Sequence, residues 1–209
     1  MKNMYLVRHG ETLFNQRDIV QGVVNSPLVL DGVAQALHTR KEYFEKKQIQ
    51  YDHVFTSPEG RCIQTTQLLT DQPYTAVRNL YEMCFGKLEG APVYLCPPAD
   101  QFDTYYGTIG GETTAQVQTR YNKALFKIMD DPANQNVLVV AHGSANYAFA
   151  TFWKKDWQVQ KLDTLNNCSV LHFLYDPQAK KFILKEVFNE DFHTDRLQEA
   201  IAMHQALIV

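Results

Sequence analysis

The segment Tyr5-Leu6-Val7-Arg8-His9-Gly10 has a counterpart in Leu138-Val139-Val140-Ala141-His142-Gly143, so a His-Gly pair twice follows a short apolar run. Apolar runs of this length are typical of buried strands. If the two strands are parallel neighbours, both histidines lie at the carboxyl edge of one sheet, where open α/β sheets bind ligands. A single histidine at a strand end is more often a hydrogen-bonded core group, but the repeated context favours a site. The glycine after each histidine lets the backbone turn sharply and approach a ligand.

The rest of the chain alternates strand-like and helix-like patterns, which predicts a layered α/β fold. Asp31 and the Ser57-Pro58 pair are typical helix starts, and Thr113 with Gln116 resembles a capping box. By contrast, Gly90 to Gly111 is rich in proline, glycine and aromatic residues, which favours a surface loop. The other predicted elements are strands over 54–56 and 137–141, a hairpin over 170–175 and 182–187, and an amphipathic tail helix over 194–208.

Length and composition restrict the class of protein. The 209 residues suit one domain over 1–209, and the net charge of −3 with scattered lysines and arginines argues against a nucleic-acid-binding face. No apolar run reaches the roughly 20 residues that span a bilayer, and Arg8 interrupts the N-terminal run before it could form a secretory signal. We therefore expect a cytoplasmic protein with no membrane partner and four reduced cysteines. Monomer and homodimer both remain open.

Two arginines strengthen the case for an anion site. Arg8 directly precedes His9, and Arg61 falls in the first turn of the helix predicted after Ser57. A guanidinium group stays charged and its planar fork matches phosphate geometry, while helix N-termini attract anions. By itself Arg61 would be read as a surface salt-bridge partner. Beside Arg8 and the two histidines, it indicates phosphate binding.

Such a site can carry out covalent phosphoryl transfer. A neutral imidazole held in one tautomer can attack phosphorus, and positioned cations stabilise the anionic group that is transferred. The leaving oxygen then needs a proton, which a carboxylic acid of raised pKa can supply. Glu82 lies between Leu80-Tyr81 and Phe85-Gly86, so we expect it to be partly buried. Without the other residues, Glu82 would suggest only a structural carboxylate.

A series of motifs resembles, in the same order, those of the phosphoglycerate mutase-like histidine phosphatases, over roughly residues 4 to 188. The motifs are Arg8-His9-Gly10-Glu11-Thr12 with Asn15, Gln21-Gly22 with Pro27-Leu28, Thr56-Ser57-Pro58 with Arg61 and Gln64-Thr65, Glu82 with Phe85-Gly86 and Glu89-Gly90, Gly110-Gly111-Glu112, Val140-Ala141-His142-Gly143, and Asn166-Asn167-Cys168-Ser169. The resemblance implies a three-layer α/β sandwich whose mostly parallel central sheet is flanked by helices. The chain departs from the family pattern at Val23-Val24-Asn25-Ser26, where an acidic residue is common, and at Thr66, where alanine is common.

The resemblance also implies roles for individual residues. His9 would be the phosphorylated nucleophile and Glu82 the proton donor, with Glu11 and Glu112 supporting the site structurally. The implied catalytic set is Arg8, His9, Arg61, Glu82 and His142, of which Arg8, Arg61 and His142 line the phosphate pocket. The implied substrate-binding set is Asn15, Gln21, Gly22 and Gly143. No cofactor and no metal are implied.

The chemistry could serve hydrolysis or isomerisation. Ala91 to Gly110 contains neither lysine nor arginine and offers Asp100 and Asp103 instead, whereas a mutase that holds a bisphosphate usually has basic residues there. We therefore expect hydrolysis of a small phosphorylated metabolite, with a phosphoglycerate mutase-type enzyme as the alternative. A non-catalytic phosphate-binding protein is disfavoured because every core position is present. A metal site is disfavoured because the two arginines would repel a divalent cation.

Overall fold

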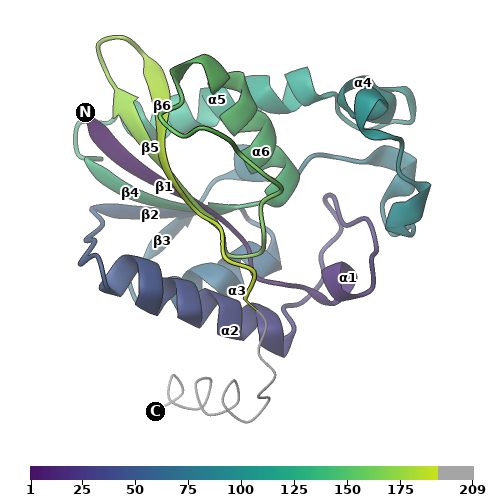
Figure 1. Ribbon diagram of the computed structural model, residues 1–209, viewed down its shortest axis with the longest axis horizontal. Helices are drawn as coiled ribbons and strands as arrows, with labels where there is room; N and C mark the ends of the chain where they lie inside the picture. Colours follow the sequence, from purple (N-terminus) through teal and green to yellow (C-terminus); the bar gives the residue numbers. More distant parts are fainter. Residues whose placement is uncertain (193–209) are drawn as a thin grey trace.

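The computed structural model describes residues 1–192 and is built around one six-stranded sheet (Figure 1). Its strands are β1 (Lys2–Arg8), β2 (His53–Thr56), β3 (Tyr74–Ala76), β4 (Asn136–Ala141), β5 (Val170–Asp176) and β6 (Lys181–Phe188). The order is β3-β2-β4-β1-β5-β6, in which the first four strands pair in parallel and the last two pair antiparallel. This confirms the predicted α/β class and the mostly parallel sheet. The predicted tail helix over 194–208 lies outside the described residues.

Helices cover both faces of this sheet (Figure 1). On one face lie α2 (Leu30–Thr39), its π-helical continuation (Arg40–Glu45) and α3 (Gly60–Leu69); on the other lie α5 (Thr114–Asp130) and α6 (Gly143–Phe152). The short helices α1 (Leu13–Gln16) and α4 (Phe102–Thr108) lie beyond the carboxyl ends of β1 and β4. None of the helices in the described part of the chain is long and apolar enough to cross a membrane.

The two helical layers follow from alternation along β1. Met4 and Leu6 pack in one apolar cluster with residues of α5 and α6, whereas Tyr5 and Val7 pack in a second cluster with residues of the α2 and α3 layer. The residues of β4 from 137 to 141 are all fully buried, because both faces of the central strands are covered. Burying one such aliphatic side chain contributes about 1.5–3 kcal/mol. These strands therefore provide a rigid base for the residues that follow them.

The residues that follow β1 and β4 meet at one edge of the sheet. The two strands pair in parallel with Arg8 opposite Ala141, so His9 and His142 come next in each strand. β2 pairs in parallel with β4 and ends at the same edge. His142 occupies the N-cap position of α6 and Gly143 begins the helix. The prediction that these two strands are parallel neighbours is therefore confirmed.

The start of α3 differs from the prediction. The helix begins at Gly60 with Glu59 at the N-cap position, and not at the Ser57-Pro58 pair. The reason is that the Ser57 hydroxyl donates to the Glu59 carboxylate and lies 2.8 Å from Nε2 of His142, so it does not cap a backbone N–H. Arg61 nevertheless lies in the first turn, as predicted.

Of the other predicted boundaries, one helix start is wrong, whereas one capping box and one hairpin are confirmed. Asp31 is not the N-cap of α2, which is Val29; Asp31 lies within the first turn, where a carboxylate still interacts favourably with the helix dipole. Thr113 and Gln116 do form the predicted capping box of α5. The predicted closing hairpin is the antiparallel pair β5 and β6.

The segment from 90 to 111 is not the open surface loop that its composition predicts. It contains two 3₁₀ turns, η4 (Val93–Leu95) and η5 (Ala99–Gln101), followed by α4. Tyr106 of α4 is fully buried and packs edge-to-face against Phe85 and Phe102, with ring centroids 4.8 and 5.0 Å away. Prolines and glycines interrupt the segment, but its aromatic side chains have enough apolar area to fold it onto the protein.

Candidate active site

A cavity of about 660 Å³ opens at the carboxyl edge of the sheet. Its walls come from the residues after β1, the start of α6, the first turn of α3, and the segments around 15–22 and 82–106. Of the implied catalytic and substrate-binding residues, all but His142 line it: Arg8, His9, Asn15, Gln21, Gly22, Arg61, Glu82 and Gly143. The fold thus brings together residues that are separated by more than a hundred positions in the chain.

His9 is held in one tautomer. Its side chain is buried, and its Nδ1 lies 2.8 Å from the carbonyl oxygen of Gly10. A carbonyl can only accept a hydrogen bond, so Nδ1 carries the proton and Nε2 keeps its lone pair. Burial, and after it the positive charge of Arg61, lowers the pKa of His9 well below the usual histidine range. The imidazole is therefore neutral and nucleophilic at neutral pH.

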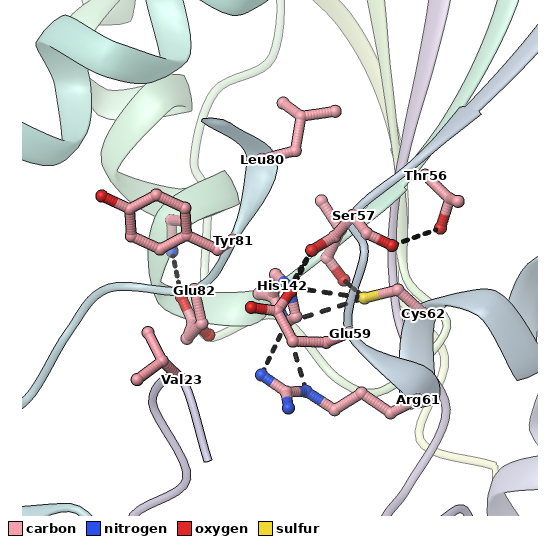
Figure 2. Close-up of polar contacts among 12 residues, drawn as sticks. Val23, Thr56, Ser57, Glu59, Arg61, Cys62, Leu80, Tyr81, Glu82 and His142 are labelled. Atoms are coloured by element: carbon pink, nitrogen blue, oxygen red, sulfur yellow. Dashed lines mark hydrogen bonds and ion pairs between the residues drawn. The ribbon is translucent and has the colours of Figure 1, made fainter. Parts of the chain in front are cut away.

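Arg61 is fully buried and fixed on three sides. Its Nη2 donates to the carbonyl oxygen of Gly22 at 2.7 Å, and its Nη1 to that of Val24 at 3.0 Å. Its Nε and Nη2 both reach Nδ1 of His142, at 3.2 and 3.0 Å (Figure 2). Gly22 has φ of 55°, a conformation that favours glycine, and this turn directs its carbonyl toward the guanidinium.

His142 contacts Arg61, and its ring meets that of His9 edge-on with centroids 5.4 Å apart, although it is not among the residues that line the cavity. Because its Nδ1 accepts from Arg61, its proton is on Nε2, which lies 2.9 Å from a carboxylate oxygen of Glu59 and 2.8 Å from the Ser57 hydroxyl oxygen. Figure 2 shows Arg61, Glu59, Ser57 and Cys62 gathered around this one imidazole. Burial lowers the pKa of His142 well below the usual range, and Arg61 acts in the same direction. The neutral imidazole therefore links Glu59 to Arg61.

Sequence reasoning did not single out Glu59 as a site residue. Glu59 precedes Arg61 by two positions, in a segment that reads as an ordinary helix start, and its partner His142 comes 83 residues later. No periodicity or spacing connects the two residues. A carboxylate close before the arginine of the second motif is the one local signal that could have suggested it.

Two hydrogen-bond donors in the cavity wall have no partner in the described part of the chain. They are Nε of Arg8 and Nε2 of Gln21, both buried. The side-chain amide oxygen of Gln21 is already paired, because it accepts a hydrogen bond from the Thr12 hydroxyl at 3.0 Å. Gly143 keeps the Arg8 side chain accessible, since a Cβ atom there would lie 3.0 Å from Arg8 Nε. Buried donors are rarely left unpaired, so this wall suits an oxyanion.

Glu82 lies at the N-terminus of α6. One carboxylate oxygen accepts from the backbone N–H groups of Met83 and Ala145, both at 2.8 Å, and the other from Ser144 at 3.2 Å. Burial raises the pKa of Glu82, and these N–H donors oppose the rise without cancelling it. The carboxyl group therefore keeps its proton to higher pH than an exposed glutamate does.

The chain around Glu82 is fixed by a half-buried ion pair. Arg120 donates from Nε to the Glu112 carboxylate at 2.7 Å and from Nη2 to the Glu82 carbonyl oxygen at 2.9 Å. The same Glu112 carboxylate accepts from the backbone N–H of Cys84 at 3.0 Å. Glu112 does not line the cavity, and its contacts are those of a structural support.

The fold and cavity together define an α/β protein in which two arginines, a neutral histidine and a buried carboxylic acid line one cavity. The chain belongs to the histidine phosphatase superfamily (branch 1), which it matches over residues 4–187. A Yersinia pestis protein named "Probable phosphoglycerate mutase GpmB" is 32% identical over 182 residues, which cover 81% of this chain and 83% of that protein.

Solved structures share the same fold. A mycobacterial glucosyl-3-phosphoglycerate phosphatase, solved in complex with VO3, superposes with a TM-score of 0.75 at 21% identity, and the match covers 91% of this chain and 100% of that one. A phosphoserine phosphatase from Entamoeba histolytica, solved with phosphoserine, superposes with a TM-score of 0.72 at 19% identity and covers 90% and 96% of the two chains. At these identities the likeness concerns the fold alone.

Proposed function

We propose that this protein hydrolyses phosphomonoesters through a phosphohistidine intermediate on His9. The observation that carries the proposal is a neutral histidine of fixed tautomer in a cavity lined by two arginines, of which Arg61 is fully buried, and by a carboxyl group of raised pKa. In the first step Nε2 of His9 forms a bond to phosphorus, and the bond to the ester oxygen breaks. Glu82 gives its proton to the departing oxygen, so the alcohol leaves neutral.

The second step returns the enzyme to its starting state. A water molecule attacks phosphorus, the bond to His9 Nε2 breaks, and the Glu82 carboxylate takes a proton from that water. Inorganic phosphate leaves, and His9 is again neutral with its proton on Nδ1. The same carboxyl group therefore serves first as acid and then as base.

Electrostatic stabilisation is assigned to the two arginines. Arg8 Nε and Gln21 Nε2 are the unpartnered donors that a phosphoryl group would satisfy, and Arg61 provides a second fixed positive charge. We assign Asn15, Gly22 and Gly143 to the walls around that group. His142 is assigned to holding the Arg61 guanidinium in place, because it contacts that group and is not among the residues that line the cavity.

Hydrolysis should not require a metal ion. We expect the purified protein to release phosphate from p-nitrophenyl phosphate at the same rate with and without EDTA, because two arginines beside His9 provide the positive charge and repel a divalent cation. The measurement is the initial rate after exhaustive chelation. Activity that disappears on chelation and returns with Mg²⁺ or Zn²⁺ would contradict the histidine mechanism.

Isomerisation of phosphoglycerates should be slow compared with hydrolysis. The only lysine or arginine side chains that line the cavity in the described chain are Arg8 and Arg61, and Asp103 contributes a negative charge from α4. A second phosphate would therefore meet repulsion. Conversion of 3- to 2-phosphoglycerate with bisphosphoglycerate present should be measured beside phosphate release. Isomerisation faster than hydrolysis would favour the mutase.

A further inference from the structure

The cavity extends well beyond the residues that would hold a phosphoryl group. Six apolar or aromatic residues form what we call the outer wall: Phe85, Val93, Phe102, Tyr106, Tyr147 and Ala148. Tyr147 and Ala148 lie on one face of α6 with Ser144 and Thr151, at the spacing that places helical residues side by side. The phosphate end and the outer wall are parts of the same cavity, so whatever is esterified to the phosphate lies against this wall.

The aromatic part of the outer wall is preformed. Phe85, Phe102 and Tyr106 contact one another edge-to-face, with centroid separations of 4.8, 5.0 and 6.2 Å. Such contacts are worth about 0.5–1.5 kcal/mol each beyond the burial of area, so the three rings support one another. A ligand that packs here does not have to order these side chains first, which lowers the free-energy cost of binding.

The charge on this part of the cavity selects against anions. Asp103 is the only charged side chain that α4 places in the cavity lining, and its carboxylate accepts from the Thr114 hydroxyl at 2.7 Å. The cations in the described lining, Arg8 and Arg61, belong to the phosphate end. A carboxylate or a second phosphate on the leaving group would therefore find repulsion and no counter-ion.

Exposed apolar side chains also belong to the cavity wall. Of the nine large hydrophobic side chains that are exposed in the described chain, Val93 and Tyr147 line the cavity. Two backbone hydrogen bonds join residues 91–93 to residues 18–20. The Val93 N–H donates to the Asp18 carbonyl at 2.7 Å, and the Val20 N–H donates to the Ala91 carbonyl at 2.8 Å. Exposed apolar side chains in a cavity wall favour an apolar ligand.

We propose that the site prefers phosphomonoesters of uncharged, apolar alcohols and phenols over those of hydroxy acids and over bisphosphates. This inference rests on the proposed function and specifies its substrate class. The cavity volume of about 660 Å³ accommodates a leaving group of drug-like size together with the phosphate. The outer wall binds an apolar leaving group. An anionic leaving group would be repelled by Asp103 and would find no third cation among the described lining residues.

A homologous series of esters tests the apolar preference. Ethyl, butyl and hexyl phosphate release alcohols of nearly equal acidity, so differences in kcat/KM report contact with the protein and not chemistry. We expect kcat/KM to rise about three- to four-fold for each methylene that becomes buried. Hexyl phosphate is then compared with 6-phosphooxyhexanoate, which has the same chain and a terminal carboxylate; kcat/KM should fall roughly ten-fold or more.

Matched variants locate the effect. Phe102→Ala should flatten the increase with chain length, and Phe102→Leu should restore most of it. Tyr94→Ala is the control, because Tyr94 is an aromatic residue of the same segment but is 83% exposed and does not line the cavity. Asp103→Asn should reduce the penalty on the carboxylate ester and leave the alkyl series unchanged.

The outcomes separate the two proposals. Hydrolysis of ethyl phosphate with no increase for longer chains, or equal rates for the carboxylate ester, would overturn the inference and leave the phosphatase proposal standing. Equal loss of chain-length dependence in Phe102→Ala and Tyr94→Ala would show that the effect does not come from the outer wall and would also overturn it. No phosphate release from any ester would overturn both proposals.

Discussion

Replacing His9 with alanine should reduce kcat on the order of 10⁶-fold, the scale seen when the nucleophile of a covalent mechanism is removed. Among the described lining residues, the His9 imidazole is the only one that is neutral, held in one tautomer and without a hydrogen-bond partner at its second nitrogen. Water would then have to attack the ester directly, with help only from the arginines. Binding of inorganic phosphate should survive, because Arg61 and the unpartnered donors remain.

A trapping experiment tests the intermediate itself. Wild-type protein quenched under alkaline conditions with ³²P-labelled substrate should retain label that is stable to base and released by acid, as expected of a phosphoramidate. The His9→Ala protein should retain none. His53→Gln is a suitable control, because His53 begins β2 and bonds to Asn134 through its Nδ1, far from the carboxyl edge of the sheet. Label found on a serine or an aspartate would refute the assignment.

Replacing Glu82 with glutamine should have an effect that depends on the leaving group. With an alkyl phosphate we expect a loss of roughly 10²–10⁴-fold in kcat, the usual contribution of general acid catalysis. With p-nitrophenyl phosphate the loss should be much smaller, because the departing phenolate needs little protonation. The glutamine can still accept the backbone N–H bonds from Met83 and Ala145 through its amide oxygen, so the substitution tests the proton and not the fold.

The pH profile gives the same test an independent readout. His9 must be neutral to attack, and its lowered pKa moves the acidic limb below the usual histidine range. Glu82 must be protonated, and its raised pKa moves the alkaline limb above the usual glutamate range. Glu82→Gln should therefore remove the alkaline limb on an alkyl ester and leave the acidic limb in place. Equal losses on both ester types with an unchanged profile would mean that Glu82 only positions the phosphate. Glu42→Gln is the control, because Glu42 is a half-exposed carboxylate that pairs with Lys46 and does not line the cavity.

Much of the fold follows from local patterns. The apolar run of β1 alternates between the two helical layers, and the fully buried β4 is an uninterrupted apolar run, so both strands could be predicted from side chains alone. The capping box at Thr113 and Gln116 likewise acts within four residues. The positions of Arg8 and His9 followed because Arg8 ends such a strand and His9 comes directly after it.

Predictions failed where partners distant in sequence compete for a residue. Ser57 has the chemistry of an N-cap, but Glu59 and His142 occupy its hydroxyl, and α3 begins later. The place of His142 in the phosphate pocket stays a prediction: its ring lies edge-on to that of His9 with centroids 5.4 Å apart, while its two nitrogens face Arg61 and Glu59. Its position in the chain is correct, but the direction of its ring depends on residues that only the folded chain brings close.

The amino-acid composition of the segment from 90 to 111 gave a wrong prediction of a surface loop. Proline and glycine content indicates a loop when their effect on the backbone dominates. Here Tyr106 contributes a fully buried ring that contacts Phe85 and Phe102. These contacts stabilise a folded segment despite the interruptions by proline and glycine. The packing partner Phe85 lies outside the segment, so no window confined to 90–111 could reveal it.

Arg61 has a consequence for the protein as a whole. Its guanidinium is shielded from water and is held by two carbonyl oxygens and a neutral ring, and among the described residues it forms no direct ion pair with a carboxylate. A charge in that situation opposes folding until a counter-ion arrives. An oxyanion in the cavity supplies one, so ligand and native state are thermodynamically linked. Under the proposed hydrolysis, inorganic phosphate should therefore both inhibit the next turnover and raise the free energy of unfolding.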